Sequence, residues 1–241
     1  MEIRNLHKSF RDNHVLRGLD LDVPPGKTVV IMGPSGCGKS VLLKHLVGLL
    51  KPDSGQILVG GQDTVPLEGE ALEAATRKFA MVFQSAALLN SLTVGENVGL
   101  ALKEQRRLPK SEIEALVTEK LELVGLGGKQ KLMPAELSGG MKKRVAVARA
   151  LALSPQIILY DEPTTGLDPF MSDNVDELIR EMKERLGITS IVVTHDLVSS
   201  FHVADHVAMF SEGKIVEVGT PAEIQNSSLP YVKRFLSSHR L

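Results

Sequence analysis

The sequence of 241 residues contains a single cysteine, so no internal disulfide bond is possible, and a reducing compartment fits this usage. Its charges nearly cancel, with 28 lysines and arginines against 29 aspartates and glutamates. A formal net charge of −1 argues against nucleic acid as a main partner, because no basic excess would attract a phosphate backbone. These absences exclude a disulfide-stabilised scaffold and disfavour a nucleic-acid-binding protein.

Long hydrophobic runs are also missing. No apolar run reaches the roughly 20 residues that a membrane-spanning helix needs. The first residues, MEIRNLHKSF, lack the apolar core of a secretory signal. We therefore expect a cytoplasmic protein whose work at a membrane, if it has any, goes through a partner. The remaining composition, 43% hydrophobic and 24% charged residues, is ordinary for a globular chain that buries a substantial core.

What the sequence does contain is a glycine-rich segment, GPSGCGKS, at residues 33–40, which we call the phosphate loop. Its spacing, G-x-x-x-x-G-K-S, is typical of loops that bind the phosphates of a nucleotide. Glycines let the backbone amides turn toward an anion, and the helix that follows adds the positive end of its dipole. Lys39 is expected to reach the β- and γ-phosphates, and the Ser40 hydroxyl to coordinate Mg²⁺. The flanking strand and helix patterns favour nucleotide binding over a simple glycine-rich turn.

Acidic residues and a histidine follow two other strand patterns. The segment IILYDE, residues 157–162, ends in two carboxylates, and ligands of open α/β sheets lie at the carboxyl ends of strands. We expect Asp161 to hold Mg²⁺ through water and Glu162 to polarise the attacking water. His195 follows SIVVT and is expected to contact the γ-phosphate. The alternatives are an acidic pair that opens a loop and a helix-capping histidine, and the phosphate loop in the same chain disfavours both.

A second helix start has the features of an anion site. In LSGGM, residues 137–141, Ser138 is a natural N-cap, and two glycines leave the helix start uncovered. The alternative is an ordinary capped helix, with the basic residues 142–144 as a solvated face. Two histidines, His202 and His206, have the i, i+4 spacing of zinc ligands, but the predicted helix ends between them, which disfavours a metal there.

Apolar patterning predicts the fold class. The runs at residues 28–32, 157–160 and 190–193 are apolar on both faces, which is typical of parallel strands covered by helices on both sides. Residues 2–22 read as short strands around a polar turn. Residues 85–155 contain helical patterns and no such strand. We therefore expect an α/β fold: a mainly parallel sheet flanked by helices, an N-terminal antiparallel β subdomain and an inserted α-helical subdomain.

With these motifs in this order, the chain resembles the ATP-binding subunits of ABC transporters over nearly its full length. GPSGCGKS matches the Walker A loop, IILYDE the Walker B strand and LSGGM the family signature. The resemblance implies a P-loop NTPase fold in a single nucleotide-binding domain over residues 1–241. Residues 1–84 and 156–241 would form a RecA-like core with the β subdomain, and residues 85–155 a helical subdomain that carries the signature.

The resemblance also implies roles for single residues. It makes Gln84 the Q-loop glutamine, Asp168 the aspartate of the D-loop (residues 164–169) and Phe10 the aromatic ring against adenine. It implies that Glu162, His195 and Gln84 are catalytic, and that Ser40, Gln84 and Asp161 hold the metal. The implied nucleotide contacts are Phe10, Gly33, Pro34, Ser35, Gly36, Cys37, Gly38, Lys39, Ser40, Val41, Ser138, Gly139, Gly140 and Asp168. One departure is Met141, which ends the signature where the family usually has glutamine.

The family's mechanism implies ATP and Mg²⁺ as ligands and a homodimer as the working form. Two subunits dock head to tail, and each ATP lies between the Walker A loop of one chain and the signature of the other. An integral membrane permease is the implied partner, which places the chain on the cytoplasmic face of the inner membrane. The apolar side chains of residues 85–98 are expected to line a groove for a short permease helix.

Two stretches and the tail narrow the implied substrate. FQSAALLNSLTVGENV, LSGGMKKRVAVARALALSPQIILYDEPTTGLDP and PYVKRFL are most similar to the Mla/Mce branch of lipid-trafficking ATPases. This resemblance implies phospholipid transport and a lipid-binding substrate protein as a further partner. The alternatives are an ABC ATPase for another substrate, such as amino acids or lipoprotein release, and a non-transport P-loop NTPase. A GTP-binding switch is disfavoured because no N-K-x-D segment is present.

Overall fold

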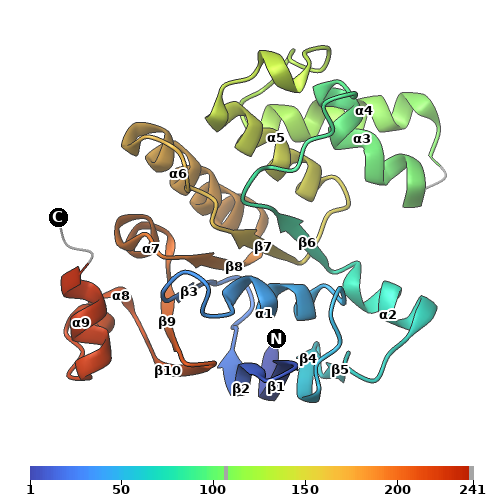
Figure 1. The fold of residues 1–241 in the computed structure, drawn as a ribbon. Coiled ribbons are helices and arrows are strands. Elements are labelled where there is room, and N and C mark those ends of the chain that lie inside the picture. The colour runs from blue at the N-terminus through green and yellow to red at the C-terminus, as the bar shows by residue number, and fades with distance from the viewer. Residues whose placement is uncertain (106–107, 239–241) are drawn as a thin grey trace.

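A computed structural model describes residues 1–105 and 108–238, and within these ranges it confirms the α/β class. A six-stranded sheet has the order β10-β9-β3-β8-β7-β6, and a four-stranded sheet has the order β2-β1-β4-β5 (Figure 1). The strands are β1 (Glu2–Phe10), β2 (Asn13–Asp22), β3 (Thr28–Met32), β4 (Ser54–Val59), β5 (Gln62–Asp63), β6 (Phe79–Val82), β7 (Ile157–Asp161), β8 (Thr189–Thr194), β9 (His206–Ser211) and β10 (Lys214–Gly219).

Helices cover both faces of the six-stranded sheet. They are α1 (Lys39–Leu46), α2 (Gly69–Thr76), α3 (Val94–Gln105), α4 (Lys110–Leu123), α5 (Gly139–Leu151), α6 (Pro169–Leu186), α7 (Leu197–Val203), α8 (Pro221–Gln225) and α9 (Pro230–Ser238), with a 3₁₀ turn at Pro134–Glu136. Among the described residues, no helix combines the length and the apolar character that crossing a bilayer requires. Helices α3 to α7 lie on one side of this sheet, and α1 lies on the other (Figure 1).

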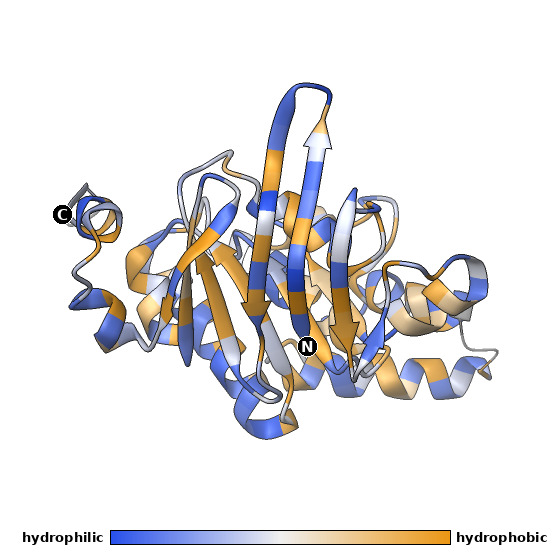
Figure 2. Ribbon diagram, turned by 90° about the horizontal axis from the view of Figure 1, so that it is seen from below, coloured by the Kyte–Doolittle hydropathy of each residue, from blue (hydrophilic) through white to orange (hydrophobic). Residues whose placement is uncertain are grey.

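The six-stranded sheet is parallel except at β10, which pairs antiparallel with β9. Every residue of β3 and of β8 is buried, as expected for strands that are covered on both faces. The long β1–β2 hairpin instead alternates between polar and apolar residues, which Figure 2 shows as colour bands along its two strands. One face of that hairpin therefore packs against the core while the other meets water.

Helix α1 lies between the two sheets. Its residues Leu42, Leu43 and Leu46 share one apolar cluster with side chains of the hairpin, such as Leu6, and of the parallel sheet, such as Ile31. A second cluster packs α3 to α6 on the opposite face of the parallel sheet. The helix that begins at the phosphate loop is thus clamped by both sheets, which fixes the loop relative to the strand ends.

Three element boundaries bear on the sequence motifs. The inserted helical segment begins with two separate helices, α3 and α4. Helix α6 begins directly after the D-loop at Pro169, because Asp168 caps it and proline is favourable in the first turn. His202 lies on α7, whereas His206 begins β9, so their spacing does not place them on one helical face.

Candidate nucleotide-binding site

The phosphate loop needs its glycines for conformation and for space. Gly36 and Gly38 have positive φ values of 77° and 115°, which residues with a Cβ rarely adopt. A Cβ on Gly38 would lie 2.7 Å from Val15 Cγ1, and one on Gly33 would lie 2.6 Å from the carbonyl oxygen of Phe210. These close approaches let the loop run directly from β3 into α1, as a phosphate cradle requires.

Lys39 is the first residue of α1, and its side chain extends across the phosphate loop. Its buried ammonium donates to the carbonyl oxygens of Gly33 at 2.8 Å and Pro34 at 3.0 Å. It also lies 3.7 Å from Oε1 of Glu162. The cation therefore stands between the loop and a carboxylate at the end of β7, within reach of an anion that the loop holds.

Ser40 and Asp161 lie together beside the loop. The Ser40 hydroxyl donates to Asp161 Oδ1 at 2.9 Å. Burial raises the pKa of Asp161, and the hydrogen bond from Ser40 opposes this shift. A hydroxyl and a carboxylate oxygen are ligands that Mg²⁺ accepts, often with water and phosphate oxygens completing its shell. This oxygen pair fits the metal predicted from the sequence.

Glu162 follows β7 in a left-handed backbone conformation, with φ of 48°. Its amide donates to the carbonyl oxygen of Val193 at 2.9 Å, which ties it to the neighbouring strand β8. His195 Nδ1 donates to Glu162 Oε2 at 2.9 Å, and the Thr165 hydroxyl donates to the same oxygen at 3.1 Å. The structure thus brings Glu162 and His195 together, and it adds Thr165, which the sequence analysis did not single out.

Lys143 corrects the reading of residues 142–144 as a solvated face. It is buried, and its ammonium donates to the backbone carbonyl oxygens of Gln84 and, at 3.4 Å, of Glu162. Burial lowers the pKa of Lys143, while the nearby carboxylates of Glu162 and Asp161 oppose that shift. The side chain of Gln84 is exposed and makes no hydrogen bond with any described residue. Gln84 therefore joins the site through its backbone.

The segment after Gln84 is fixed by side chains from the helices. Arg149 on α5 donates to the carbonyl oxygens of Ala86 and Ala87, both of which have positive φ. The buried Asn97 on α3 holds the backbone of Leu89 through its side-chain oxygen and nitrogen. Ala86 is buried, while the side chain of Leu89 is 46% exposed. Part of the apolar surface expected here packs inside, and part of it faces outward.

The signature and the D-loop form one surface. Ser138 caps α5 by accepting from the amide of Met141 at 3.3 Å, and Asp168 caps α6 by accepting from the amide of Met171 at 3.0 Å. A Cβ on Gly140 would lie 3.0 Å from Sδ of Met171, so the two helix starts touch. Within the described residues, Ser138, Gly139, Gly140 and Asp168 make no hydrogen bond to the phosphate loop.

The remaining predicted contacts lie around the loop. Phe10 is 43% exposed, and the ammonium of Lys8 lies 5.5 Å from its ring centroid, which is cation–π distance. Val41 lies in the first turn of α1, and its carbonyl oxygen accepts from His45 Nδ1 at 2.7 Å. Burial raises the pKa of the Cys37 thiol, although Lys39 opposes the shift.

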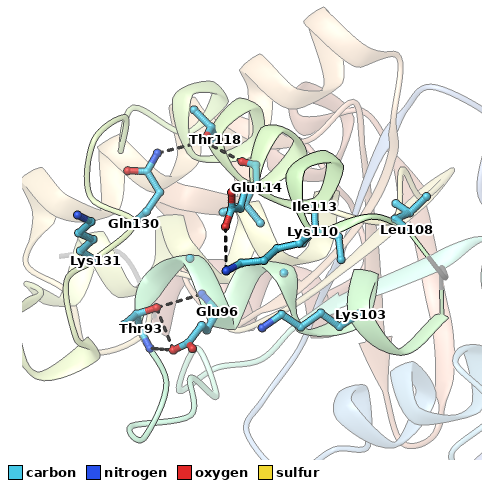
Figure 3. Close-up of a pocket in the computed structure, with 13 residues that line it drawn as sticks. Thr93, Glu96, Lys103, Leu108, Lys110, Ile113, Glu114, Thr118, Gln130 and Lys131 are labelled. Carbon is cyan, nitrogen blue, oxygen red and sulfur yellow. Dashed lines mark hydrogen bonds and ion pairs between the residues drawn. The ribbon is translucent and has the colours of Figure 1, made fainter.

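A cavity of about 840 Å³ lies elsewhere, between α3 and α4 (Figure 3). Its rim carries an ion pair between Lys110 and Glu114 at 3.8 Å and a hydrogen bond from Gln130 to Thr118 at 3.4 Å. Gly99, which also lines the cavity, permits close helix packing, because a Cβ there would lie 3.2 Å from Val117 Cγ2. No residue of the phosphate loop lines this cavity, so it is separate from the nucleotide site.

The chain is similar to known proteins over most of its length. A family model described as ABC transporter matches residues 16–165. The intermembrane phospholipid transport system ATP-binding protein MlaF of Haemophilus influenzae is 41% identical over 236 residues, which cover 98% of this chain and 89% of that protein. The probable ribonucleotide transport ATP-binding protein mkl of Mycobacterium leprae is 40% identical over 241 residues, all of this chain and 70% of that protein. The dimeric structure of the ATP-binding cassette MJ0796 in a post-hydrolysis state with ADP and Pi has a TM-score of 0.82 and 32% identity, covering 91% of this chain and 98% of that one.

Proposed function

The chain belongs to the ABC transporter family as an ATPase, and from that premise we propose that it drives phospholipid movement through an integral membrane permease. Likeness to MlaF over nearly the whole chain supports the substrate. We further propose a lipid-binding substrate protein as a third component and a position on the cytoplasmic face of the membrane. Within the chain, residues 85–155 would act as the helical subdomain on a core of residues 1–84 and 156–241.

The observation that carries the catalytic proposal is the convergence of Lys39, Ser40, Asp161, Glu162 and His195 at one end of the parallel sheet. Lys39 would exchange its two carbonyl acceptors for phosphate oxygens, which form stronger charge-assisted hydrogen bonds. Ser40 and Asp161 would hold Mg²⁺, whose charge offsets that of the phosphates.

Glu162 is the residue that would take the proton of the attacking water. Its Oε2 is held by His195 and Thr165, so the carboxylate is oriented before substrate arrives. His195 would act both on this carboxylate and on the γ-phosphate. The hydrogen bond that the Glu162 amide donates to the carbonyl oxygen of Val193, and the one that Lys143 donates to the Glu162 carbonyl oxygen, fix the main chain that bears this carboxylate.

The nucleotide contacts of Ser138, Gly139, Gly140 and Asp168 would be made across a head-to-tail dimer. Their exposed helix start makes no hydrogen bond to its own phosphate loop, so the phosphate loop of a second copy is the partner that it fits. Phe10 would stack on adenine with the ring face that Lys8 leaves open. Gln84, whose side chain is exposed and makes no hydrogen bond with a described residue, would turn toward the metal when the dimer closes.

Glu162→Gln tests the catalytic assignment. Losing the base should lower the rate of ATP hydrolysis by on the order of 10²–10⁴ while ATP binding persists. With ATP and Mg²⁺, the variant should elute as a stable dimer in size-exclusion chromatography, and without Mg²⁺ it should not. An unchanged hydrolysis rate would contradict the role of Glu162.

Reconstitution with the permease in vesicles tests the substrate. ATP should drive transfer of a fluorescent phospholipid in the wild type and not with Glu162→Gln. Transfer of ribonucleotides, amino acids or another polar solute instead would reject the lipid assignment and leave the ATPase assignment intact.

A further inference from the structure

A cavity of about 280 Å³ lies next to the hydrolysis site, and the last described helix forms one of its walls. The phosphate loop contributes Pro34 and Ser35, and the loop after β8 contributes His195. Helix α9 contributes Tyr231 and Arg234, among others, from the opposite side. Figure 1 shows α9 at the edge of the molecule farthest from α2. A segment near the end of the described chain therefore borders residues that were assigned to γ-phosphate chemistry.

Helix α9 is firmly attached at this place. The Tyr231 hydroxyl donates to the carbonyl oxygen of Phe210 at 2.7 Å, the same oxygen that closely approaches Gly33. Val232 and Leu236 are buried in an apolar cluster with Met209 of β9. The helix thus presents its remaining side chains at a defined distance from the phosphate loop.

Arg234 is the charged group of this wall. It is exposed, and its guanidinium makes no hydrogen bond or ion pair with a described residue. A guanidinium is always protonated and suits planar pairing with a carboxylate. The cavity therefore offers an aromatic surface and a positive charge that no described residue pairs, beside the phosphate loop.

The first turn of α6 carries a complementary surface on the same chain. Phe170 is 72% exposed, an unusual state for a phenylalanine, and Asp173 lies three residues later on the same helical face with a side chain that is 64% exposed. His202 Nδ1 lies 4.0 Å from Oδ1 of Asp173. Met171 points the other way, onto Gly140 of the signature. This turn therefore stands directly beside the signature and presents one aromatic ring and one carboxylate outward.

We propose that, in the head-to-tail dimer, the first turn of α6 of one subunit docks into the α9 cavity of the other. Phe170 would pack against Tyr231, and Asp173 would pair with Arg234. The proposal rests on the proposed function, in which each signature faces the phosphate loop of the second copy. Because the D-loop and the start of α6 pack on the signature, they arrive beside that phosphate loop, where Pro34, Ser35 and His195 line the cavity.

This contact would extend the dimer interface from the two ATP sites onto α9. Since the dimer has twofold symmetry, the Phe170–Tyr231 contact and the Asp173–Arg234 ion pair each occur twice. Each substitution therefore acts at two places in the interface. The pairing of an aromatic anchor with an arginine is typical of residues that dominate binding energy at interfaces. Separation of the subunits after hydrolysis would then also release α9.

Charge reversal in the Glu162→Gln background tests the proposal, because that variant accumulates the ATP-bound dimer. Arg234→Glu and Asp173→Arg should each weaken ATP-dependent dimerisation at least about tenfold in sedimentation equilibrium. The double variant, which restores opposite charges at each pair, should dimerise within about threefold of the parent. Phe170→Ala should weaken the dimer without affecting ATP binding to the dilute monomer.

Lys233→Glu is the matched control, since it makes the same charge change on the adjacent exposed residue of α9 and should leave dimerisation within about twofold. The proposal is overturned if the double variant is no tighter than the single ones. It is also overturned if Arg234→Glu weakens ATP binding to the dilute monomer, because Arg234 would then contact nucleotide within its own chain. If Glu162→Gln itself forms no dimer with ATP, the head-to-tail function fails together with the contact. A normal dimer in all the charge-reversed variants rejects the contact alone.

Discussion

Asp176, on the buried face of α6, is a carboxyl group with 2% of its surface exposed, and it lies outside the nucleotide site. The hydroxyl of Ser199 on α7 donates to it. Burial raises the pKa of Asp176 to about 6, and the carboxylates of Asp196 and Asp173 add to the shift, while Ser199 and His202 oppose it. A single residue thus makes the packing of α6 on α7 sensitive to pH in a range that a cell can reach.

The sign of this effect follows from proton binding. An unfolded aspartate titrates near its ordinary pKa of 3.8, whereas the folded one titrates near 6, so between these values the folded state holds the extra proton. The free energy of unfolding should therefore fall as pH rises from about 4 to about 6, by up to about 3 kcal/mol. Asp176→Asn should remove this slope and stabilise the protein at pH 8, as urea denaturation at several pH values would show. Glu184→Gln, an exposed change near the other end of the same helix, is the control, and an unchanged slope in Asp176→Asn would contradict the assignment.

At the scale of elements, α5 connects three parts of the site. Its first residues form the signature, Lys143 contacts the backbones of Gln84 and Glu162, and Arg149 holds the carbonyl oxygens of Ala86 and Ala87. A displacement of α5 would therefore move the segment after Gln84 and the backbone of Glu162, the proposed catalytic carboxylate, together. This helix is the element that joins the nucleotide side of the molecule to the proposed permease side.

Lys143→Met tests that connection, because methionine keeps the length of the side chain and removes both hydrogen bonds. We expect hydrolysis to fall at least about tenfold, since the carbonyl groups of Gln84 and Glu162 lose a donor and the backbone of Glu162 is less well fixed. ATP affinity of the monomer should stay within about twofold. Steady-state kinetics measures the hydrolysis rate, and nucleotide titration measures the ATP affinity. Lys142→Met, the same change on the neighbouring residue, is the control. A variant with full turnover would show that the bond between α5 and Glu162 has no mechanistic role.

Elements were easier to predict from the sequence than contacts between them. The strands that precede the phosphate loop, Glu162 and His195 were found because local apolar runs specify them. Lys143 was missed because its partner Gln84 lies 59 residues away, and no local pattern shows that a lysine in a basic run is buried. The position of α9 beside Ser35 was missed for the same reason, since only the packing of Tyr231 on Phe210 creates it. Thr165 was overlooked because a threonine in a turn has no distinctive spacing.

At the scale of the whole molecule, the exposed side chains after Gln84 form the surface that we propose for the permease contact. Leu89→Asp should leave the isolated subunit folded and able to bind ATP, because the side chain is 46% exposed and Asn97 holds only its backbone. Co-purification with the permease should be lost, since burying an unpaired carboxylate is costly. Ser91→Asp adds the same charge at an exposed position of this segment and is the control. Retained co-purification with Leu89→Asp would place the permease contact elsewhere.

The head-to-tail arrangement of the dimer can be tested with a mixed dimer in which each subunit carries a different inactivating substitution. Ser138→Arg should block the γ-phosphate of the second copy, and Lys39→Ala should weaken ATP binding in its own chain. In a mixed dimer, both lesions fall at one composite site, and the other site keeps intact residues from both chains. An equimolar mixture should therefore hydrolyse ATP faster than either variant alone. Equal activities would argue that both sites are needed or that the subunits do not dock head to tail.

The cavity between α3 and α4 has a consequence for selective inhibition. A compound aimed at the triphosphate must displace ATP and must also discriminate among all proteins that carry the same loop. The cavity of about 840 Å³ shares no residue with that loop, and its lining combines apolar helix faces with lysines and glutamates at the rim (Figure 3). A compound bound in this cavity would not compete with cellular nucleotide. Its selectivity for this protein over other ATPases would depend on the helix residues that line the cavity, which do not have to bind phosphate.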